Sequence, residues 1–224
     1  MKPIRHALIM AAGRGTRMLP LTDQIPKPMA PFKGSTLIAD GIQKIKPVLD
    51  FVHITVGYKG AVLAQHVIEL GVQSVFNTEG KGNAWWIYNT LLRHLDEAIF
   101  VLTADNVTDL DFDLLEQEYY KYNAPACMVV PVLPVPGLEG DYIHHTENCV
   151  FELNRQKPAP TYCSGIQILN PYRINQITEA TEDFNVLWRQ LIEKKQLYCS
   201  DSYPKKWFTV DTVEQLDRLN KGKI

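Results

Sequence analysis

His6 to Gly13 reads HALIMAAG, an apolar run that ends in small residues and a glycine. A run of this kind is typical of a buried β-strand that enters a tight loop. Strand-like and helix-like stretches then alternate along the chain. The strand-like stretches cover residues 51–58, 72–77 and 98–105, and the helix-like stretches cover residues 35–50, 59–71 and 83–95. This alternation predicts an α/β fold with a mainly parallel sheet that carries helices on both faces.

The second half of the chain is less regular but contains the same two kinds of segment. We expect strands at 126–135, 149–154 and 161–170, a helix at 184–194, and a strand, turn and helix over 207–220. No linker or shift in composition divides the 224 residues, so we expect a single domain over residues 1–224. Ligands of parallel sheets bind beyond the carboxyl ends of the strands, and Gly13 and Asp105 both follow such ends.

Charge and hydropathy exclude several kinds of partner. The chain has 23 Lys and Arg residues against 25 Asp and Glu residues, so its net charge of −2 provides no overall positive field for nucleic acid or an anionic membrane. No apolar run approaches the roughly 18 residues of a membrane span, and the N-terminus lacks the pattern of a signal peptide. We therefore expect a cytoplasmic protein with four reduced cysteines, and neither nucleic acid nor a membrane as a partner.

The stretch MAAGRGTRMLPLTDQIPKPM, residues 10–29, has the composition of a phosphate-binding loop. A Walker A loop needs four residues between its glycines and a following Lys-Ser or Lys-Thr, which this stretch lacks. The dinucleotide fingerprint G-x-G-x-x-G fits Gly13 and Gly15, but Met18 stands at its third glycine and makes the match weak.

A third interpretation is a loop whose backbone amides hold a nucleotide while cations reach its triphosphate. Arg14, Arg17 and Lys27 supply those cations, and arginine forks match the geometry of phosphate. The alternative is an ordinary turn with solvated cations. The continuation into Pro-Lys-Pro-Met favours the nucleotide loop.

The stretch from Met10 to Gly34 resembles the N-terminal signature of the sugar-1-phosphate nucleotidyltransferases, which runs Ala-Ala-Gly-x-Gly-Thr-Arg and continues to Pro-Lys-Pro. The resemblance implies a three-layer, Rossmann-like fold of GT-A type. It also implies that Arg17 holds the β- and γ-phosphates of a nucleoside triphosphate and that Lys27 contacts the α-phosphate. The residues that would line the nucleotide by their backbone are Ala11, Ala12, Gly13, Arg14, Gly15 and Thr16.

Two later segments fit the nucleotide half of this resemblance. Asn77 and Gly82 have the spacing of the family's Gln-x-x-x-x-Gly, which reads the base. Asp105, in FVLTADN, and Asp211, in WFTVDT, correspond to the family's two metal-binding aspartates. Mg²⁺ favours one or two carboxylates together with substrate oxygens, so the resemblance implies a Mg²⁺ site at this pair.

The segment ELNRQKPAPTYCSGIQIL, residues 152–169, resembles the part of the family that binds the acceptor. Lys157 corresponds to the lysine that holds the acceptor's phosphate, and Gly165 to the glycine whose backbone faces the sugar. Gln156 stands where the family has a glutamate for sugar hydroxyls, which leaves the identity of the acceptor open.

These residues together predict an enzyme that transfers a nucleoside monophosphate from a triphosphate to a phosphorylated acceptor, most simply a sugar 1-phosphate, with Mg²⁺ as cofactor. One alternative is a cytidylyltransferase for phosphocholine, because TADN resembles the Asp-Ala-Asp-Asn of those enzymes. Trp85 and Trp86 would then form an aromatic wall, or else would pack a helix on the sheet. A second alternative is a nucleotide-binding regulatory domain without chemistry. The base, and the choice between a monomer and a homo-oligomer, stay open.

Overall fold

The computed structural model describes residues 3–135, 138 and 140–222 and divides into two compact units. The unit that we call the N-terminal unit contains residues 5–81, 102–108 and 208–222. The central unit contains residues 3–4, 82–101 and 109–207. The expectation of a single domain over the whole chain stays a prediction.

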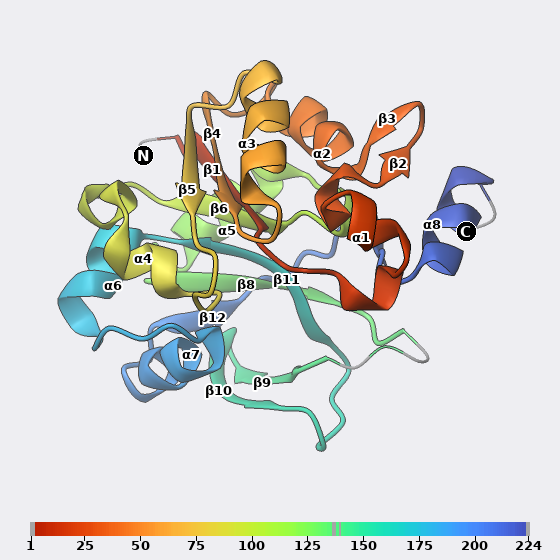
Figure 1. Ribbon diagram of the computed structural model, residues 1–224. Helices are drawn as coiled ribbons and strands as arrows, with labels where there is room; N and C mark the ends of the chain where they lie inside the picture. The colour runs from red at the N-terminus through yellow and green to blue at the C-terminus, as the bar shows by residue number, and fades with distance from the viewer. Residues whose placement is uncertain (1–2, 136–137, 139, 223–224) are drawn as a thin grey trace. The chain divides into compact units, whose positions relative to one another are not determined.

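The N-terminal unit contains a parallel sheet with strand order β5-β4-β1 (Figure 1). Its strands are β1 (His6–Ala11), β4 (Phe51–Val56) and β5 (Ser74–Asn77). The connecting helices are α2 (Leu37–Ile45) and α3 (Gly60–Glu69). Thr36 caps α2 by accepting a hydrogen bond from the Ala39 N–H at 3.2 Å, and Gly71 follows α3 with a φ of 76°. The predicted alternation in this part of the chain is confirmed.

Short elements complete the N-terminal unit within and around the Gly13 loop, residues 12–18, which follows β1. They are η1 (Thr16–Met18), α1 (Leu21–Gln24), η2 (Lys27–Met29), the hairpin of β2 (Pro31–Phe32) and β3 (Ser35–Thr36), and the closing helix α8 (Val213–Asn220). Three further strands each begin in one unit and end in the other: β6 (Ile99–Thr103), β7 (Asn106–Asp109) and β13 (Lys206–Thr209).

The central unit contains a mixed sheet with strand order β6-β11-β8-β12-β10-β9. Among its described strands, only β8 and β12 pair in parallel. Its strands are β8 (Cys127–Val132), β9 (Tyr142–Thr146), β10 (Cys149–Asn154), β11 (Tyr162–Leu169) and β12 (Leu197–Cys199). Its helices are α4 (Trp85–Asn89), η3 (Leu91–His94), α5 (Phe112–Lys121), α6 (Pro171–Ile177) and α7 (Phe184–Glu193). The predicted α/β class is confirmed. The predicted parallel pairing holds for β5-β4-β1 and for β8–β12, whereas the other pairs of the central unit are antiparallel.

The predicted helix at 83–95 is wrong in one respect, because it breaks at Thr90. Helix α4 ends at Asn89, and the shorter helix η3 begins at Leu91. The Thr90 hydroxyl donates to the Trp86 carbonyl at 2.7 Å and accepts from the Leu92 N–H at 3.3 Å. This side chain therefore closes the first helix and starts the second.

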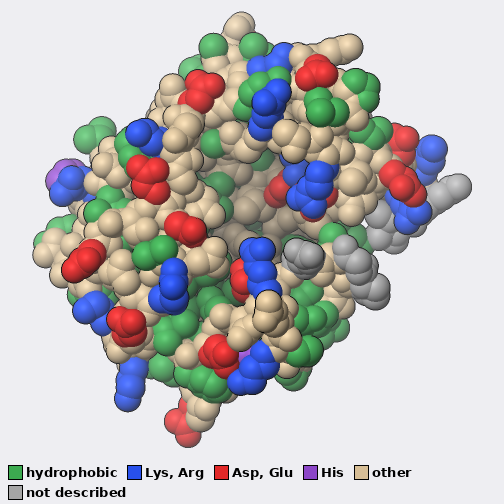
Figure 2. Space-filling model, turned by 60° about the horizontal axis from the view of Figure 1, so that its bottom comes forward, with side chains coloured by type: hydrophobic (Ala, Val, Ile, Leu, Met, Phe, Trp, Pro, Cys, Tyr) green, Lys and Arg blue, Asp and Glu red, His purple; other side chains and the backbone are tan. Residues whose placement is uncertain are grey.

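Charged side chains of both signs share the surface. On the face shown in Figure 2, Lys and Arg are interspersed with Asp and Glu. Within the described ranges, no helix is both long and apolar enough to cross a membrane. All four cysteines are free, and two of them, Cys127 and Cys199, are buried.

Two histidines form a buried polar row across the parallel strands of the N-terminal unit. His6 of β1 and His53 of β4 stack with ring centroids 5.3 Å apart, and His6 Nδ1 lies 3.0 Å from His53 Nε2. His53 Nδ1 lies 2.7 Å from Ser74 Oγ of β5. Burial, and secondarily the neighbouring His6, lower the pKa of His53 to about 4. His53 is therefore neutral in the folded protein at pH 7.

This histidine should make stability depend on pH. The pKa of His53 falls from an ordinary 6.5 to about 4 on folding, so its contribution is complete above pH 6.5 and is lost as the pH falls toward 4. Between pH 7 and pH 4, the free energy of unfolding of the natural protein should fall by about 2 kcal/mol more than that of His53→Gln. Urea denaturation measures the difference, with the exposed His94→Gln variant as control. Parallel pH profiles for the natural protein and His53→Gln would contradict the prediction.

Met18 anchors the end of the Gly13 loop in an apolar cluster. Its side chain is fully buried. The other buried members of the cluster are Ala30, Phe32, Leu37, Val210 and Leu216. The residue that spoils the dinucleotide fingerprint is thus a core residue that ties the loop to helix α8.

Truncation of Met18 should destabilise the fold. We expect Met18→Ala to lower the free energy of unfolding by about 3 kcal/mol, because it leaves a cavity in a fully buried cluster. Met18→Leu, which nearly conserves the volume, should cost less than about 1.5 kcal/mol. Urea denaturation at pH 7 measures both, with Val48→Ala as an exposed control. A loss in the free energy of unfolding for Met18→Ala that is no larger than the loss for Val48→Ala would contradict the core role of Met18.

Candidate functional site

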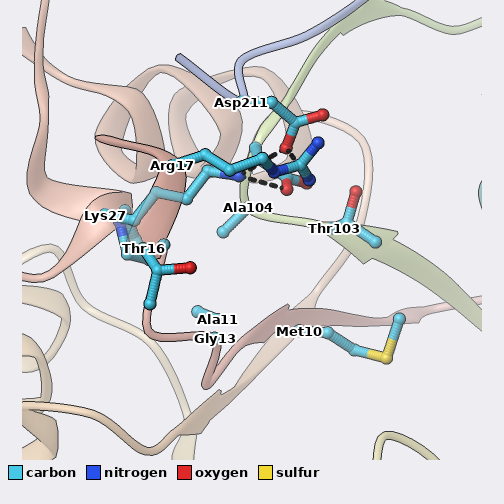
Figure 3. Close-up of a pocket in the computed structure, with 12 residues that line it drawn as sticks. Met10, Ala11, Gly13, Thr16, Arg17, Lys27, Thr103, Ala104 and Asp211 are labelled. Carbon is cyan, nitrogen blue, oxygen red and sulfur yellow. Dashed lines mark hydrogen bonds and ion pairs between the residues drawn. The ribbon is translucent and has the colours of Figure 1, made fainter. Parts of the chain in front are cut away.

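A pocket in the N-terminal unit lies between the Gly13 loop and the ends of β1 and β6. Its volume is about 290 Å³. Figure 3 shows residues that line it. The pocket is lined by Met10, Ala11, Gly13, Gly15, Thr16, Arg17, Lys27, Pro28, Thr103, Ala104, Asp105 and Asp211. Most of the predicted nucleotide and metal residues therefore line one cavity, and all the lining residues belong to one compact unit.

The Gly13 loop presents backbone donors that nothing else uses. In the part of the chain that the structure describes, the N–H groups of residues 13–16 form no hydrogen bond. Gly15 has a φ of 67°, and the Thr22 hydroxyl donates to its carbonyl at 3.0 Å. A run of unpaired backbone donors beside a pocket favours an anion.

Gly15 also makes room for Lys27. A Cβ atom at Gly15 would lie 2.8 Å from Lys27 Cβ and 3.0 Å from Lys27 Cδ, which is too close for real atoms. The aliphatic stem of Lys27 therefore runs directly against the backbone of the loop. Its ammonium group reaches into the pocket as a result.

Two cations and two carboxylates converge in this pocket. Lys27 Nζ lies 2.7 Å from Asp105 Oδ2 and 3.0 Å from Asp211 Oδ1. Arg17 Nη2 donates to the same Asp211 oxygen at 2.8 Å. The side chains of Lys27 and Asp211 are 11% and 13% exposed, whereas that of Arg17 is 69% exposed. The contacts of Lys27 are thus more sheltered from water than the contact of Arg17. Figure 3 shows the side chains of Lys27 and Arg17 extending toward Asp211.

Backbone hydrogen bonds fix the positions of both aspartates. The N–H of Ala104, just after β6, donates to the Met10 carbonyl at 3.0 Å. The Val210 N–H donates to the Asp105 carbonyl at 2.8 Å, which joins the two aspartate segments. Gln215 Oε1 accepts from the N–H of Asp211 at 2.7 Å and from the N–H of Thr212 at 3.0 Å, as part of a capping box at the start of α8.

The two carboxylates suit a divalent cation. Mg²⁺ takes one or two protein carboxylates and completes its shell with phosphate oxygens and water. Asp105 and Asp211 both contact the single ammonium of Lys27, so their oxygens converge on one cationic position. Among the described residues, no group of three or more His, Cys, Asp or Glu side chains could hold a metal. The residues present fit a site that substrate oxygens complete.

Three predicted nucleotide residues of this unit, Ala12, Arg14 and Asn77, are engaged outside the pocket lining. The Arg14 guanidinium lies 5.3 Å from the centroid of the Tyr58 ring, a cation–π distance. The Tyr58 N–H donates to the carbonyl of Ala12 at 3.2 Å. Asn77 ends β5, and its Oδ1 accepts from the Glu79 N–H at 2.9 Å.

The remaining predicted residues belong to the central unit. Gly82 donates its N–H to Glu182 Oε2 at 3.1 Å. Lys157 Nζ lies 2.8 Å from Glu152 Oε2, and the Lys157 side chain is 58% exposed. Gly165, within β11, has a φ of 83°. These observations leave the roles implied by the resemblance as predictions.

Trp85 and Trp86 differ in environment. Trp86 is 1% exposed and thus lies in the core, whereas Trp85 is half-buried. A wall that contacts a ligand needs accessible rings. The prediction that both tryptophans form an aromatic wall is therefore wrong for Trp86, which packs in the interior.

Sequence reasoning missed several residues that shape the pocket. Gln215 was overlooked although Thr-x-x-Gln before a helix is a known capping pattern. Thr103 lines the pocket, and its Oγ1 is buried without a hydrogen-bond partner among the described residues. No pattern in the sequence signals Thr103, because its importance depends on contacts with distant segments.

The chain matches a known protein family and curated relatives. Residues 6–137 match the family model described as nucleotidyl transferase. The catalytic subunit beta of mannose-1-phosphate guanylyltransferase from Drosophila melanogaster is 24% identical over 212 residues, which cover 88% of this chain and 57% of the relative. The chain thus spans less than two thirds of the length of this curated relative.

Solved structures share the fold. A UDP-glucose pyrophosphorylase complexed with UDP-glucose superposes with a TM-score of 0.75 and 18% identity, covering 98% of each chain. A CTP:phosphocholine cytidylyltransferase from Streptococcus pneumoniae superposes with a TM-score of 0.76 and 20% identity, covering 99% of this chain and 100% of that one. At these identities the similarity concerns the fold.

Proposed function

The chain belongs to the nucleotidyl transferase family, and from this premise we propose that it transfers a nucleoside monophosphate from a nucleoside triphosphate to a sugar 1-phosphate. The observation that carries the proposal is the pocket in which Arg17, Lys27, Asp105 and Asp211 converge beside unpaired loop amides. A pocket of this composition supplies positive charge and fixed donors to an anion, as phosphoryl transfer requires.

The proposed reaction is an in-line displacement at phosphorus. A phosphate oxygen of the acceptor forms a bond to the α-phosphorus of the triphosphate. The bond between that phosphorus and the bridging oxygen to the β-phosphate breaks, and pyrophosphate leaves with the electron pair. The acceptor phosphate is already an anionic nucleophile, so the protein needs no general base and acts by positioning and charge neutralisation.

Each part of the pocket has a proposed role in this reaction. The backbone from Ala11 to Thr16 cradles the nucleotide, and Arg17 binds the β- and γ-phosphates. Lys27 binds the α-phosphate and neutralises charge that develops during displacement. Asp105 and Asp211 would hold Mg²⁺, which supplies positive charge to the phosphate oxygens when bound.

The base and the acceptor are assigned to other segments by the resemblance. We propose that Asn77 and Gly82 read the base, that Lys157 binds the acceptor's phosphate and that the backbone of Gly165 faces its sugar. The name of the Drosophila relative suggests the first substrate pair to test, GTP with mannose 1-phosphate. Whether the protein acts as a monomer or a homo-oligomer stays a prediction for solution measurements.

A substrate panel tests the proposal. Purified protein with Mg²⁺ is combined with each common triphosphate and with mannose 1-phosphate, glucose 1-phosphate or phosphocholine, and pyrophosphate release is measured. We expect release with at least one sugar 1-phosphate. Release with phosphocholine alone would overturn the sugar assignment in favour of the cytidylyltransferase alternative. Triphosphate binding without release under any acceptor would favour the regulatory domain.

A further inference from the structure

Lys27 occupies the position between the carboxylates that a divalent cation would need. Its ammonium contacts Asp105 Oδ2 at 2.7 Å and Asp211 Oδ1 at 3.0 Å. These are the oxygens that the proposed function assigns to the metal. An ammonium and a divalent cation repel each other, so contact of both with the same two oxygens is unfavourable.

The surroundings make the displacement of Lys27 costly without a new partner. The Lys27 side chain is 11% exposed, and its stem lies against Gly15. Among the described residues, Asp105 and Asp211 are the only carboxylates in an ion pair with Lys27. A sheltered ammonium that loses both carboxylates keeps the cost of its desolvation without compensation. The metal alone would impose that cost.

A bound triphosphate would remove the cost, because its phosphate oxygens give Lys27 another anionic partner in the same pocket. Arg17, which is 69% exposed, also contacts Asp211 Oδ1 and can exchange this carboxylate partner for a phosphate in the same way. The free-energy cost is small because its ion pair is exposed to water. On this basis we infer that the Lys27 ammonium blocks metal binding to Asp105 and Asp211 until a triphosphate binds. The phosphate oxygens then replace the two carboxylates as partners of Lys27. Metal and nucleotide then bind with positive cooperativity, each raising the affinity of the other by the same factor.

This inference rests on the metal site of the proposed function and is tested without turnover. Mn²⁺ binding is followed by electron paramagnetic resonance, first alone and then with saturating α,β-methylene GTP, an analogue that cannot release pyrophosphate. If GTP is not the substrate, the corresponding analogue of the active triphosphate replaces it. The proteins compared are the natural chain, Lys27→Met, Lys27→Arg and Lys44→Met, and circular dichroism checks that each is folded.

For the natural protein, we expect the analogue to tighten Mn²⁺ binding by about tenfold or more. Lys27→Met should bind Mn²⁺ alone about tenfold more tightly than the natural protein, and the analogue should add little. Lys27→Arg keeps the positive charge and should behave more like the natural protein. Lys44→Met removes a lysine that pairs with Asp40 outside the pocket, and it should match the natural protein.

An Mn²⁺ affinity for Lys27→Met equal to or below that of the natural protein would overturn the inference. If the natural protein nevertheless released pyrophosphate in the substrate panel, the proposed function would stand. Tighter Mn²⁺ binding by Lys27→Met, in a protein that released pyrophosphate with no acceptor, would support the inference and reject the activity.

Discussion

The Asp211→Asn variant is expected to release pyrophosphate about a thousandfold more slowly than the natural protein. Asp211 contributes one of the two carboxylates that converge in the pocket, and its Oδ1 accepts from both Arg17 and Lys27. An amide of the same shape retains one acceptor oxygen but loses the negative charge. The proposed metal site would thus lose a ligand charge, and the two cations would lose their shared partner.

The fold should tolerate this change, because the backbone of Asp211 is held by Gln215 and not by its own carboxylate. Circular dichroism and a thermal melt close to those of the natural protein would establish this. Asp217→Asn, which alters an exposed aspartate on helix α8, serves as the matched control and should keep full activity. Activity of Asp211→Asn within tenfold of the control would remove Asp211 from the catalytic machinery.

The second large effect is expected for Arg17→Ala. The dissociation constant for the triphosphate should rise about a hundredfold, the equivalent of one or two charge-assisted hydrogen bonds to phosphate. Stability should change little, because the Arg17 side chain is 69% exposed and, within the described part of the chain, its one ion pair is the exposed contact with Asp211. Isothermal titration with the active triphosphate and Mg²⁺ measures the affinity.

Two comparisons make this prediction specific. Arg17→Lys keeps the charge without the planar fork, so its affinity should fall between those of Arg17→Ala and the natural protein. Arg218→Ala removes an exposed arginine that pairs with Glu214 on α8, and it should bind as the natural protein does. An Arg17→Ala affinity indistinguishable from that of Arg218→Ala would show that Arg17 does not bind phosphate.

Local patterns predicted the elements of the N-terminal unit well. Helix α2 was expected because its apolar residues recur at the helix period behind a cap at Ser35 or Thr36, and the structure has Thr36 as the cap. Strand β4 was expected because it lies in a β-branched run between Asp50 and Gly57. Helix 83–95 was predicted too long, because Thr90 makes hydrogen bonds that interrupt it. The pairing of the strands was harder to predict from the sequence. Strand β11 pairs antiparallel with both β6 and β8, and periodicity within a segment carries no information about its neighbours.

The candidate site was predictable in its chemistry and less so in its geometry. The Gly13 loop, Arg17 and Lys27 were recognised from their spacing and from the family they resemble. The core role of Met18 was missed, because a fully buried side chain in a glycine-rich loop becomes visible only with the segments that cover it. Gln215 had a readable capping pattern, but its hold on Asp211 depends on the turn that precedes α8.

By itself, the sequence determined which charged groups this protein has near its glycine loop and the alternation of strands and helices in the N-terminal unit. These depend on interactions between near neighbours in the chain. Only the tertiary structure decided that Lys27 lies between Asp105 and Asp211, which are 78 and 184 residues away from it. Coulomb attraction and desolvation depend on distance in space and on burial, so the partners of Lys27 are fixed only when the strands and α8 pack.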